Sequence, residues 1–244
     1  YYIDSIFDRI YDSGGNDTAY VSASFVKLPS SIEKANINYV NGAQALPYWI
    51  DALLPDEAAG KRFTTLLGDS KTFGYSFPIT LPSYETSAKD ANGFTPFTVT
   101  QQARTVDAFT YIASLLDLQF NKVSDPASKN TFTFASNIQT NSGGYASPPS
   151  SSFEGSDIYL NKVDYNDTLA DRTYGALVLI HEVGHALGLK HPFDHEQAGE
   201  GGIADAPYLT GTEENAIWTV MSYEKTKAQY QIQFSPLDIA ALQY

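Results

Sequence analysis

Three histidines at fixed spacing constrain this chain more than any other feature. His181 and His185 are four residues apart in an apolar stretch, so on an α-helix of 3.6 residues per turn both imidazoles lie on one face. Such a pair can converge on one ion at the roughly 2.0–2.1 Å typical of zinc–nitrogen bonds. His191 follows in the same run. We therefore predict a helix within residues 171–190 that leads into a three-histidine metal site.

Two more residues of this run favour a catalytic metal. Glu182 is beside the first histidine, where its carboxylate can take a proton from a water polarised by the ion. Gly188 can adopt left-handed conformations without a Cβ penalty, so the chain can turn there and bring His191 round to the ion. A chance match to this pattern has a probability on the order of 10⁻⁵. His195 is an alternative third ligand, but the turn at Gly188 favours His191.

Composition excludes several other classes of protein. The chain has 244 residues, 15 Lys plus Arg against 28 Asp plus Glu, and no Cys. A thiolate zinc cluster, a catalytic cysteine and a small disulfide-stapled fold are therefore excluded. The shortage of basic residues argues against a nucleic-acid partner. No apolar run reaches the roughly 18 to 20 residues of a spanning helix, which argues against membrane insertion.

The pattern along the chain predicts two parts, a β-rich N-terminal extension (residues 1–45) and a globular domain (residues 46–244). In the extension, strands are expected within residues 19–28 and 35–40. The run Gly-Gly-Asn-Asp at residues 14–17 resembles half of a calcium-binding nonapeptide. A plain turn joining two strands is favoured there over a calcium ligand.

In the domain, apolar residues at steps of three and four predict an amphipathic helix with polar Gln101, Gln102 and Arg104 between them. The apolar stripe consists of Val99, Ala103, Val106, Phe109, Ala113, Leu116 and Phe120. Other expected elements are a short helix at residues 48–54, strands at 72–81, 131–135 and 156–161, and a loop at 136–152.

Met221 is the only methionine, in the run Thr219-Val220-Met221-Ser222-Tyr223. Behind a three-histidine site this run resembles the Met-turn of the metzincin clan of zinc endopeptidases. Within the clan the chain most resembles the serralysin family (peptidase family M10) of secreted bacterial proteases. The resemblance rests on residues 185–192, on Met221-Ser222-Tyr223, on the strand at 156–160 and on residues 236–243.

The resemblance implies an α+β fold, a metzincin domain with a twisted mixed β-sheet, long helices and a zinc cleft. It implies a secreted, extracellular endopeptidase with one catalytic Zn²⁺, exported without a cleaved signal peptide. Met221 would lie under the metal. Tyr223 would be a zinc ligand in the resting enzyme and would then stabilise the substrate oxyanion. The chain would be the catalytic fragment of a larger RTX-type protein, because the family continues into a calcium-filled β-roll.

The expected partners are protein or peptide substrates, and the chain is expected to be a monomer. An extended substrate adds most readily to an exposed sheet edge, which we expect to be the strand Asp157, Ile158, Tyr159 and Leu160. Such pairing reads the substrate backbone and predicts broad specificity, with the pocket after the scissile bond shaped by the Met-turn segment.

Three alternatives stay open. An acidic loop between the zinc motif and the Met-turn is read as solvated, with Ca²⁺ binding as the minority option. Its acids are Asp194, Glu196, Glu200, Asp205, Glu213 and Glu214. The domain could also be a non-catalytic, zinc-stabilised module of a large bacterial adhesin, although such a site has no need of Glu182. It could finally be a latent protease whose residues 1–45 occupy the cleft.

Overall fold

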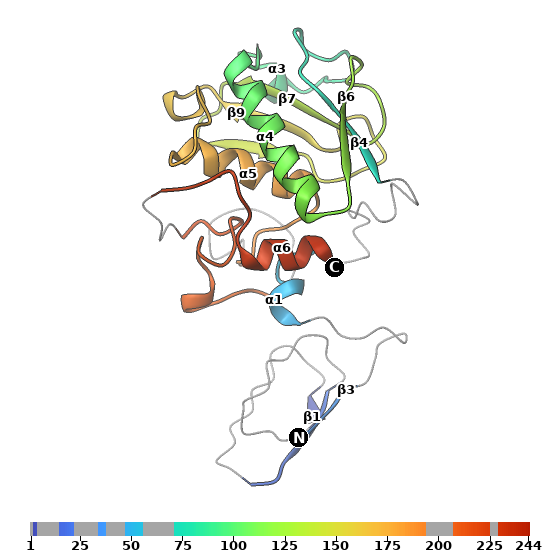
Figure 1. The fold of residues 1–244 in the computed structure, drawn as a ribbon, viewed down its shortest axis with the longest axis vertical. Coiled ribbons are helices and arrows are strands. Elements are labelled where there is room, and N and C mark those ends of the chain that lie inside the picture. Colours follow the sequence, from blue (N-terminus) through green and yellow to red (C-terminus); the bar gives the residue numbers. More distant parts are fainter. Residues whose placement is uncertain are drawn as a thin grey trace.

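A computed structural model describes residues 2–3, 15–21, 34–37, 47–55, 71–193, 207–224 and 229–244. Its main body combines a mixed, twisted sheet with helices (Figure 1). The strands are β1 (Tyr2–Ile3), β2 (Thr18–Val21), β3 (Lys34–Ile37), β4 (Thr72–Ser76), β5 (Thr95–Pro96), β6 (Gln119–Lys122), β7 (Thr131–Asn137), β8 (Gly144–Ala146) and β9 (Asp157–Asn161). The helices are α1 (Tyr48–Asp51), α3 (Ala88–Ala91), α4 (Val99–Leu115), α5 (Tyr174–Ala186) and α6 (Pro236–Gln243), with 3₁₀ turns η2 (Asp164–Asn166) and η3 (Gly211–Glu213).

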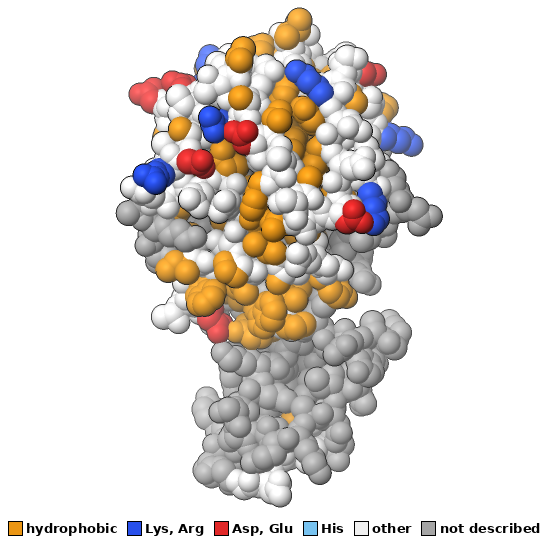
Figure 2. Space-filling model, in the orientation of Figure 1, with side chains coloured by type: hydrophobic (Ala, Val, Ile, Leu, Met, Phe, Trp, Pro, Cys, Tyr) orange, Lys and Arg blue, Asp and Glu red, His pale blue; other side chains and the backbone are white. Residues whose placement is uncertain are grey.

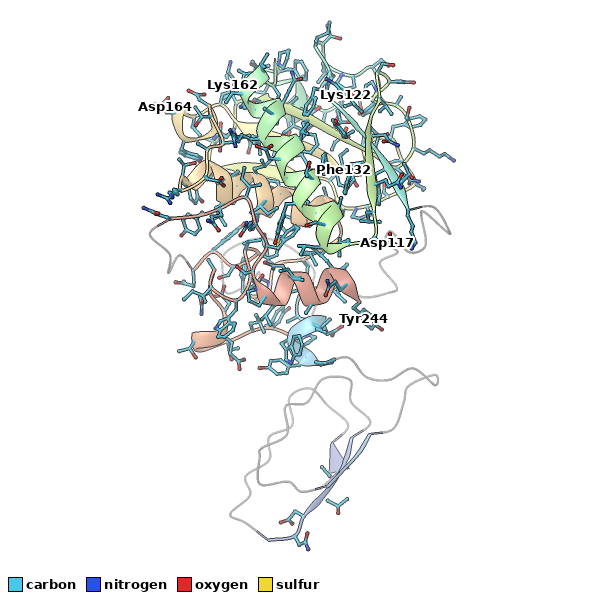
Figure 3. The ribbon with its side chains drawn as sticks, viewed as in Figure 1. Asp117, Lys122, Phe132, Lys162, Asp164 and Tyr244 are labelled. Atoms are coloured by element: carbon cyan, nitrogen blue, oxygen red, sulfur yellow. The ribbon has the colours of Figure 1, made fainter. Side chains whose placement is uncertain are left out.

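The main sheet has the strand order β6-β4-β7-β9-β8, and β5 pairs with β7. Strands β6, β4, β7 and β9 are parallel, whereas β8 runs antiparallel to β9 with Tyr145 opposite Tyr159. Phe132 of β7, labelled in Figure 3, packs against Phe109 of α4. Leu160 of β9 joins the same core as the apolar side chains of α5. Helices α4 and α5 therefore cover one face of the sheet.

Helix α4 forms where the sequence predicts a helix, but its buried stripe is different. Val99 is 84% exposed, whereas Gln101, predicted on the polar face, is buried. The reason is a capping box in which Thr98 and Gln101 satisfy each other's backbone N–H groups, while Gln101 Nε2 donates to Asn166 O. The helix ends at Leu115, so Phe120 lies in β6, where its ring stacks on Phe109 at 4.3 Å.

The predicted strands at residues 72–81, 131–135 and 156–161 correspond to β4, β7 and β9, with β4 ending earlier. The predicted helix at residues 48–54 is α1, followed by a turn. The region 136–152, read as a loop, contains the short strand β8. That strand matters for the site described below.

The described parts of the N-terminal region form a separate sheet in the order β1-β2-β3. Its strands are parallel, with Tyr2 opposite Tyr20 and Thr18 opposite Lys34. Parallel strands need a crossover connection, so no tight hairpin joins β1 to β2 or β2 to β3. Gly15 and Asn16 form a bend shortly before β2, and the choice of a plain turn over a calcium ligand there stays a prediction.

Hydrophobic side chains gather on the face shown in Figure 2, over the region of α1 and α6. Exposed hydrophobic side chains close to α6 include Tyr244, which directly follows the helix, and Trp218, whose carbonyl oxygen accepts a hydrogen bond from Leu237 N. Within the described residues, no helix has both the length and the apolar character required to traverse a bilayer.

Candidate active site

The three predicted histidines come together. His181 and His185 project from α5, whose N-cap Thr173 accepts a hydrogen bond from Ala176 N. His191 Nε2 lies 3.0 Å from His185 Nε2 and 3.2 Å from His181 Nε2. They form the one cluster of three or more potential metal ligands of this kind among the residues that the structure describes.

Backbone carbonyls fix the orientation of the two helical imidazoles. His181 Nδ1 lies 2.8 Å from Val220 O, and His185 Nδ1 lies 2.8 Å from Leu189 O. A carbonyl oxygen only accepts, so each Nδ1 carries the proton and each Nε2 keeps its lone pair. This is the outer-shell arrangement typical of metal-ligating histidines.

The donor set fits zinc. Tetrahedral zinc with nitrogen ligands holds neighbouring donor atoms about 3.3 Å apart. The observed separations of 3.0 and 3.2 Å between Nε2 atoms are close to that value. Nitrogen lone pairs that face one another at this distance repel unless a proton or a cation lies between them.

The turn after α5 is built as the sequence predicts. Gly188 has a φ of +104°, in the left-handed region that favours glycine. Leu189 N donates to Gly184 O at 2.9 Å, and Lys190 N donates to Leu53 O at 2.9 Å, which ties the turn to the segment after α1. His191 then stacks on Phe193 with ring centroids 4.8 Å apart.

Glu182 is buried beside the histidines, with 5% of its surface exposed. Burial raises its pKa to about 8, and the charge of Lys89 acts in the opposite direction. A cation held by the neighbouring histidines would also favour the ionised carboxylate.

The predicted Met-turn lies under α5. Met221 is fully buried, and a Cβ at Gly184 would lie only 2.6 Å from its Sδ, so glycine is needed for this close approach. Sequence reasoning missed the residue that supports the turn, Asp238 in the first turn of α6. Its carboxylate accepts hydrogen bonds from Thr219 Oγ1 at 2.5 Å and Val220 N at 2.8 Å. The sequence does contain an indication of this residue, because Ser235 followed three positions later by Asp238 is a pattern that can form a capping box at a helix N-terminus.

Tyr223 lines a cavity together with the three histidines and is 48% exposed. Its ring centroid lies 4.7 Å from that of His191 and 5.9 Å from that of His181. The tyrosine is therefore next to the histidine cluster.

The predicted substrate-binding edge strand is wrong. Strand β9, which holds Asp157, Ile158, Tyr159 and Leu160, pairs with β7 on one side and β8 on the other, and all its residues are buried. The edge is β8, which no other described strand pairs. Sequence reasoning missed β8 because it is short and lies in a Ser- and Gly-rich region. The one indication in the sequence is Gly144, because a glycine in a strand often marks the close approach of another group. In the structure a Cβ at this position would lie 2.9 Å from Glu182 Cγ.

Two cavities flank the histidines. Both are lined by His181, Glu182, Gly144 and Tyr223. One extends toward Pro55, Tyr145, Ala146, Pro148, His185, Gly188, Leu189, Lys190, His191 and Tyr208. The other extends toward Asn141, Ser142, Gly143, Tyr174, Leu177, Val178 and Ser222.

The predicted alternative ligand His195 and most of the acidic loop, Asp194, Glu196, Glu200 and Asp205, lie outside the described residues. The other two acids accept hydrogen bonds from protein groups. Glu213 accepts from Tyr48 Oη at 2.6 Å, and Glu214 accepts from Ser222 Oγ.

Comparison with known proteins finds proteases. The peptidase family model described as Pregnancy-associated plasma protein-A matches residues 129–233. Serralysin B of Dickeya chrysanthemi is 30% identical over 208 residues, which are 77% of this chain and 42% of that protein. Metallopeptidase AprA of Pseudomonas marginalis is 29% identical over 236 residues, 93% of this chain and 44% of that protein.

A shorter match, to the serralysin of Proteus mirabilis, has 42% identity over 80 residues, 29% of this chain and 16% of that protein. The chain thus spans less than half the length of these relatives. The sequence relationship, the mixed twisted sheet and the three-histidine cluster together identify the chain as a serralysin-like protein of the metzincin type.

Proposed function

We propose that the chain is the catalytic domain of a zinc endopeptidase that hydrolyses peptide bonds in proteins. One observation carries the proposal. Three imidazole Nε2 atoms converge beside the buried carboxyl group of Glu182, in a cavity bordered by the strand edge of β8. This combination supplies metal ligands, a proton acceptor and a place for an extended peptide.

The mechanism assigns one role to each group. Zinc held by His181, His185 and His191 would act as a Lewis acid. Glu182 accepts a proton from the attacking water and returns it to the leaving amine. Its burial favours the proton-bound form after transfer, which suits this return. Tyr223 would donate a hydrogen bond from its hydroxyl group to the oxyanion and, before substrate binds, would be a further residue that could hold the zinc.

The direction of the substrate follows from β8. The strand runs from the cavity of Leu177 and Val178 to the cavity of Leu189 and Tyr208. A substrate that pairs antiparallel with β8 places its N-terminal side in the cavity lined by Leu189 and Tyr208. Its C-terminal side then lies in the cavity lined by Leu177 and Val178. The pocket after the scissile bond is then partly apolar and bordered by Ser222 and Tyr223. Pairing through the backbone favours broad specificity.

The test compares the wild-type chain with Glu182→Gln, which keeps the shape of the side chain and removes the base. The wild type should contain about one zinc per chain and cleave casein in a chelator-sensitive manner. The variant should retain its zinc and less than about 1% of the hydrolysis. Zinc without hydrolysis in the wild type would support a non-catalytic module instead. Substantial hydrolysis by the variant would remove Glu182 from its role as base.

We further propose the division into a β-rich extension (residues 1–45) and a catalytic domain (residues 46–244), within a longer secreted protein that is monomeric. The separate pairing of β1, β2 and β3 supports the division. The limited share of the serralysin relatives that the chain covers supports the longer protein.

A further inference from the structure

The sheet face opposite α4 and α5 carries a partly buried polar layer that the proposed mechanism does not use. Asp157 and Tyr159 of β9 alternate with the core residues Ile158 and Leu160, so they point to this opposite face. We call the group of Tyr84, Glu85, Asp90, Tyr145, Asp157 and Tyr159 the carboxyl–tyrosine layer. Its members are linked to one another by hydrogen bonds, by ring stacking and by a contact between two carboxyl groups.

Asp157 has one oxygen without a donor. The residue is 1% exposed, and its Oδ2 accepts a hydrogen bond from Tyr84 Oη at 2.9 Å. Its Oδ1 is buried and meets no donor among the described residues. The carboxyl group of Glu85 lies within hydrogen-bonding reach of Asp157. Ionised carboxylates only accept, so this contact becomes a hydrogen bond when the pair holds one proton.

The layer leads from this pair to the substrate edge. Tyr159 Oη donates to Glu85 Oε1 at 3.0 Å, and the Tyr159 ring stacks on Tyr145 of β8 with centroids 5.4 Å apart. Tyr145 Oη donates to Asp90 Oδ1 at 2.5 Å and accepts from Asn137 Nδ2 at 2.7 Å. Strand β8 has three residues and one described strand neighbour, so Tyr145 is its main anchor on this face.

We propose that Glu85 and Asp157 share one proton and are positioning residues, because the hydrogen bond between them orders the layer that holds β8 in place for the substrate. The link to catalysis rests on the proposed function, since β8 is the edge on which the substrate pairs. The shared proton does not rest on it and can be measured without any activity.

The shared proton implies that the stability of the folded chain depends on pH. Burial raises the pKa of Asp157 to about 9, and burial also raises the pKa of Glu85. The groups that face the pair are Tyr84 on the preceding loop, Thr133 of β7, Tyr159 of β9 and Asp90 of α3. Among the residues that the structure describes, the ammonium group of Lys89 lies against the layer, 3.4 Å from the centroid of the Tyr145 ring.

In an unfolded chain an aspartate loses its proton near pH 4. The stabilising effect of a raised pKa is therefore complete below about pH 4 and is lost as the pH rises toward 9.

The test uses Asp157→Asn and Glu85→Gln, each of which replaces the shared proton with an amide donor. Denaturant unfolding from pH 5 to 9 should show the wild-type equilibrium constant for folding falling by up to tenfold per pH unit through this proton. Each variant should lose that slope. Asp107→Asn, at an exposed position of α4, should keep it.

Positioning is measured in the same proteins. As the pH rises through 9, the wild type should show faster hydrogen exchange at the β8 amides, after correction for the intrinsic rate, and a several-fold higher KM for a peptide. Both amide variants should lack these changes. If the wild type and both variants share one unfolding slope, the shared proton is overturned. If the slope changes while β8 exchange does not, the positioning role is overturned. A failure of the proposed function would appear as absent hydrolysis and would leave the unfolding and exchange results intact.

Discussion

At the scale of single residues, the proposed metal site depends on side chains that would not touch the metal. Asp238 binds Thr219 Oγ1 and Val220 N, and the carbonyl group of Val220 in turn orients His181. The carboxylate also accepts from Ser235 N at 2.8 Å. This fully buried aspartate therefore links the start of α6 to the Met-turn and to one zinc ligand.

We expect Asp238→Ala to lower the free energy of unfolding by about 3 kcal/mol or more, because it leaves several buried donors unsatisfied. Zinc affinity should fall as well, since Val220 O loses its fixed position. Denaturant unfolding and metal titration measure the two effects. Asp107→Ala is the control, because Asp107 is exposed on α4 and forms an ion pair with the neighbouring Arg104. An unchanged zinc affinity would show that the Met-turn does not orient His181.

The residues that could be predicted from the sequence are those whose relationship is local. His181, Glu182 and His185 lie within about one helical turn of one another, and Gly188 is recognisable from its place at the end of that helix. Asp238 is different, because its partners are separated from it along the chain and are brought close only by the tertiary fold.

At the scale of elements, the proposed catalysis requires β8 to lie close to α5. Gly144 makes this approach possible, because a Cβ there would lie 2.9 Å from Glu182 Cγ and 3.0 Å from Leu160 Cδ2. Packing in this region leaves no room for an added methyl group without movement of the strand or of the glutamate.

We therefore expect Gly144→Ala to retain zinc but to lose turnover on the order of 10- to 100-fold, because small displacements of reacting groups are costly. Zinc content and casein hydrolysis measure the two quantities. Asp107→Ala, at an exposed position of α4 that lines neither cavity, is the control. Equal activity of Gly144→Ala and the wild type would contradict a close fit between β8 and Glu182.

Element types were more predictable than their neighbours. The strand-like residue patterns of β7 and β9 and the helical periodicity of α4 and α5 are properties of single segments. The edge position of β8 depends on strand order, which periodicity does not contain. The burial of Gln101 likewise depends on Asn166, which lies on a distant segment.

At the scale of the whole molecule, the histidine cluster joins three separate parts of the chain. His181 and His185 come from α5, His191 follows the turn at Gly188, and Val220 O connects the cluster to the Met-turn. A cation at this place would hold the three parts together, and its binding free energy would add to the stability of the folded state.

We expect removal of zinc by a chelator to lower the free energy of unfolding by about 3 kcal/mol when the wild type is first loaded at a free zinc concentration about 100 times its Kd. The difference should shrink as the pH falls below about 6.5, because protons compete for histidine nitrogens. Denaturant unfolding with and without chelator measures it. Glu182→Gln should keep the full difference, because it is not a ligand, whereas His185→Ala should lose most of it. If chelator leaves the stability of the wild type unchanged, the three histidines do not hold a metal that bridges these parts of the fold.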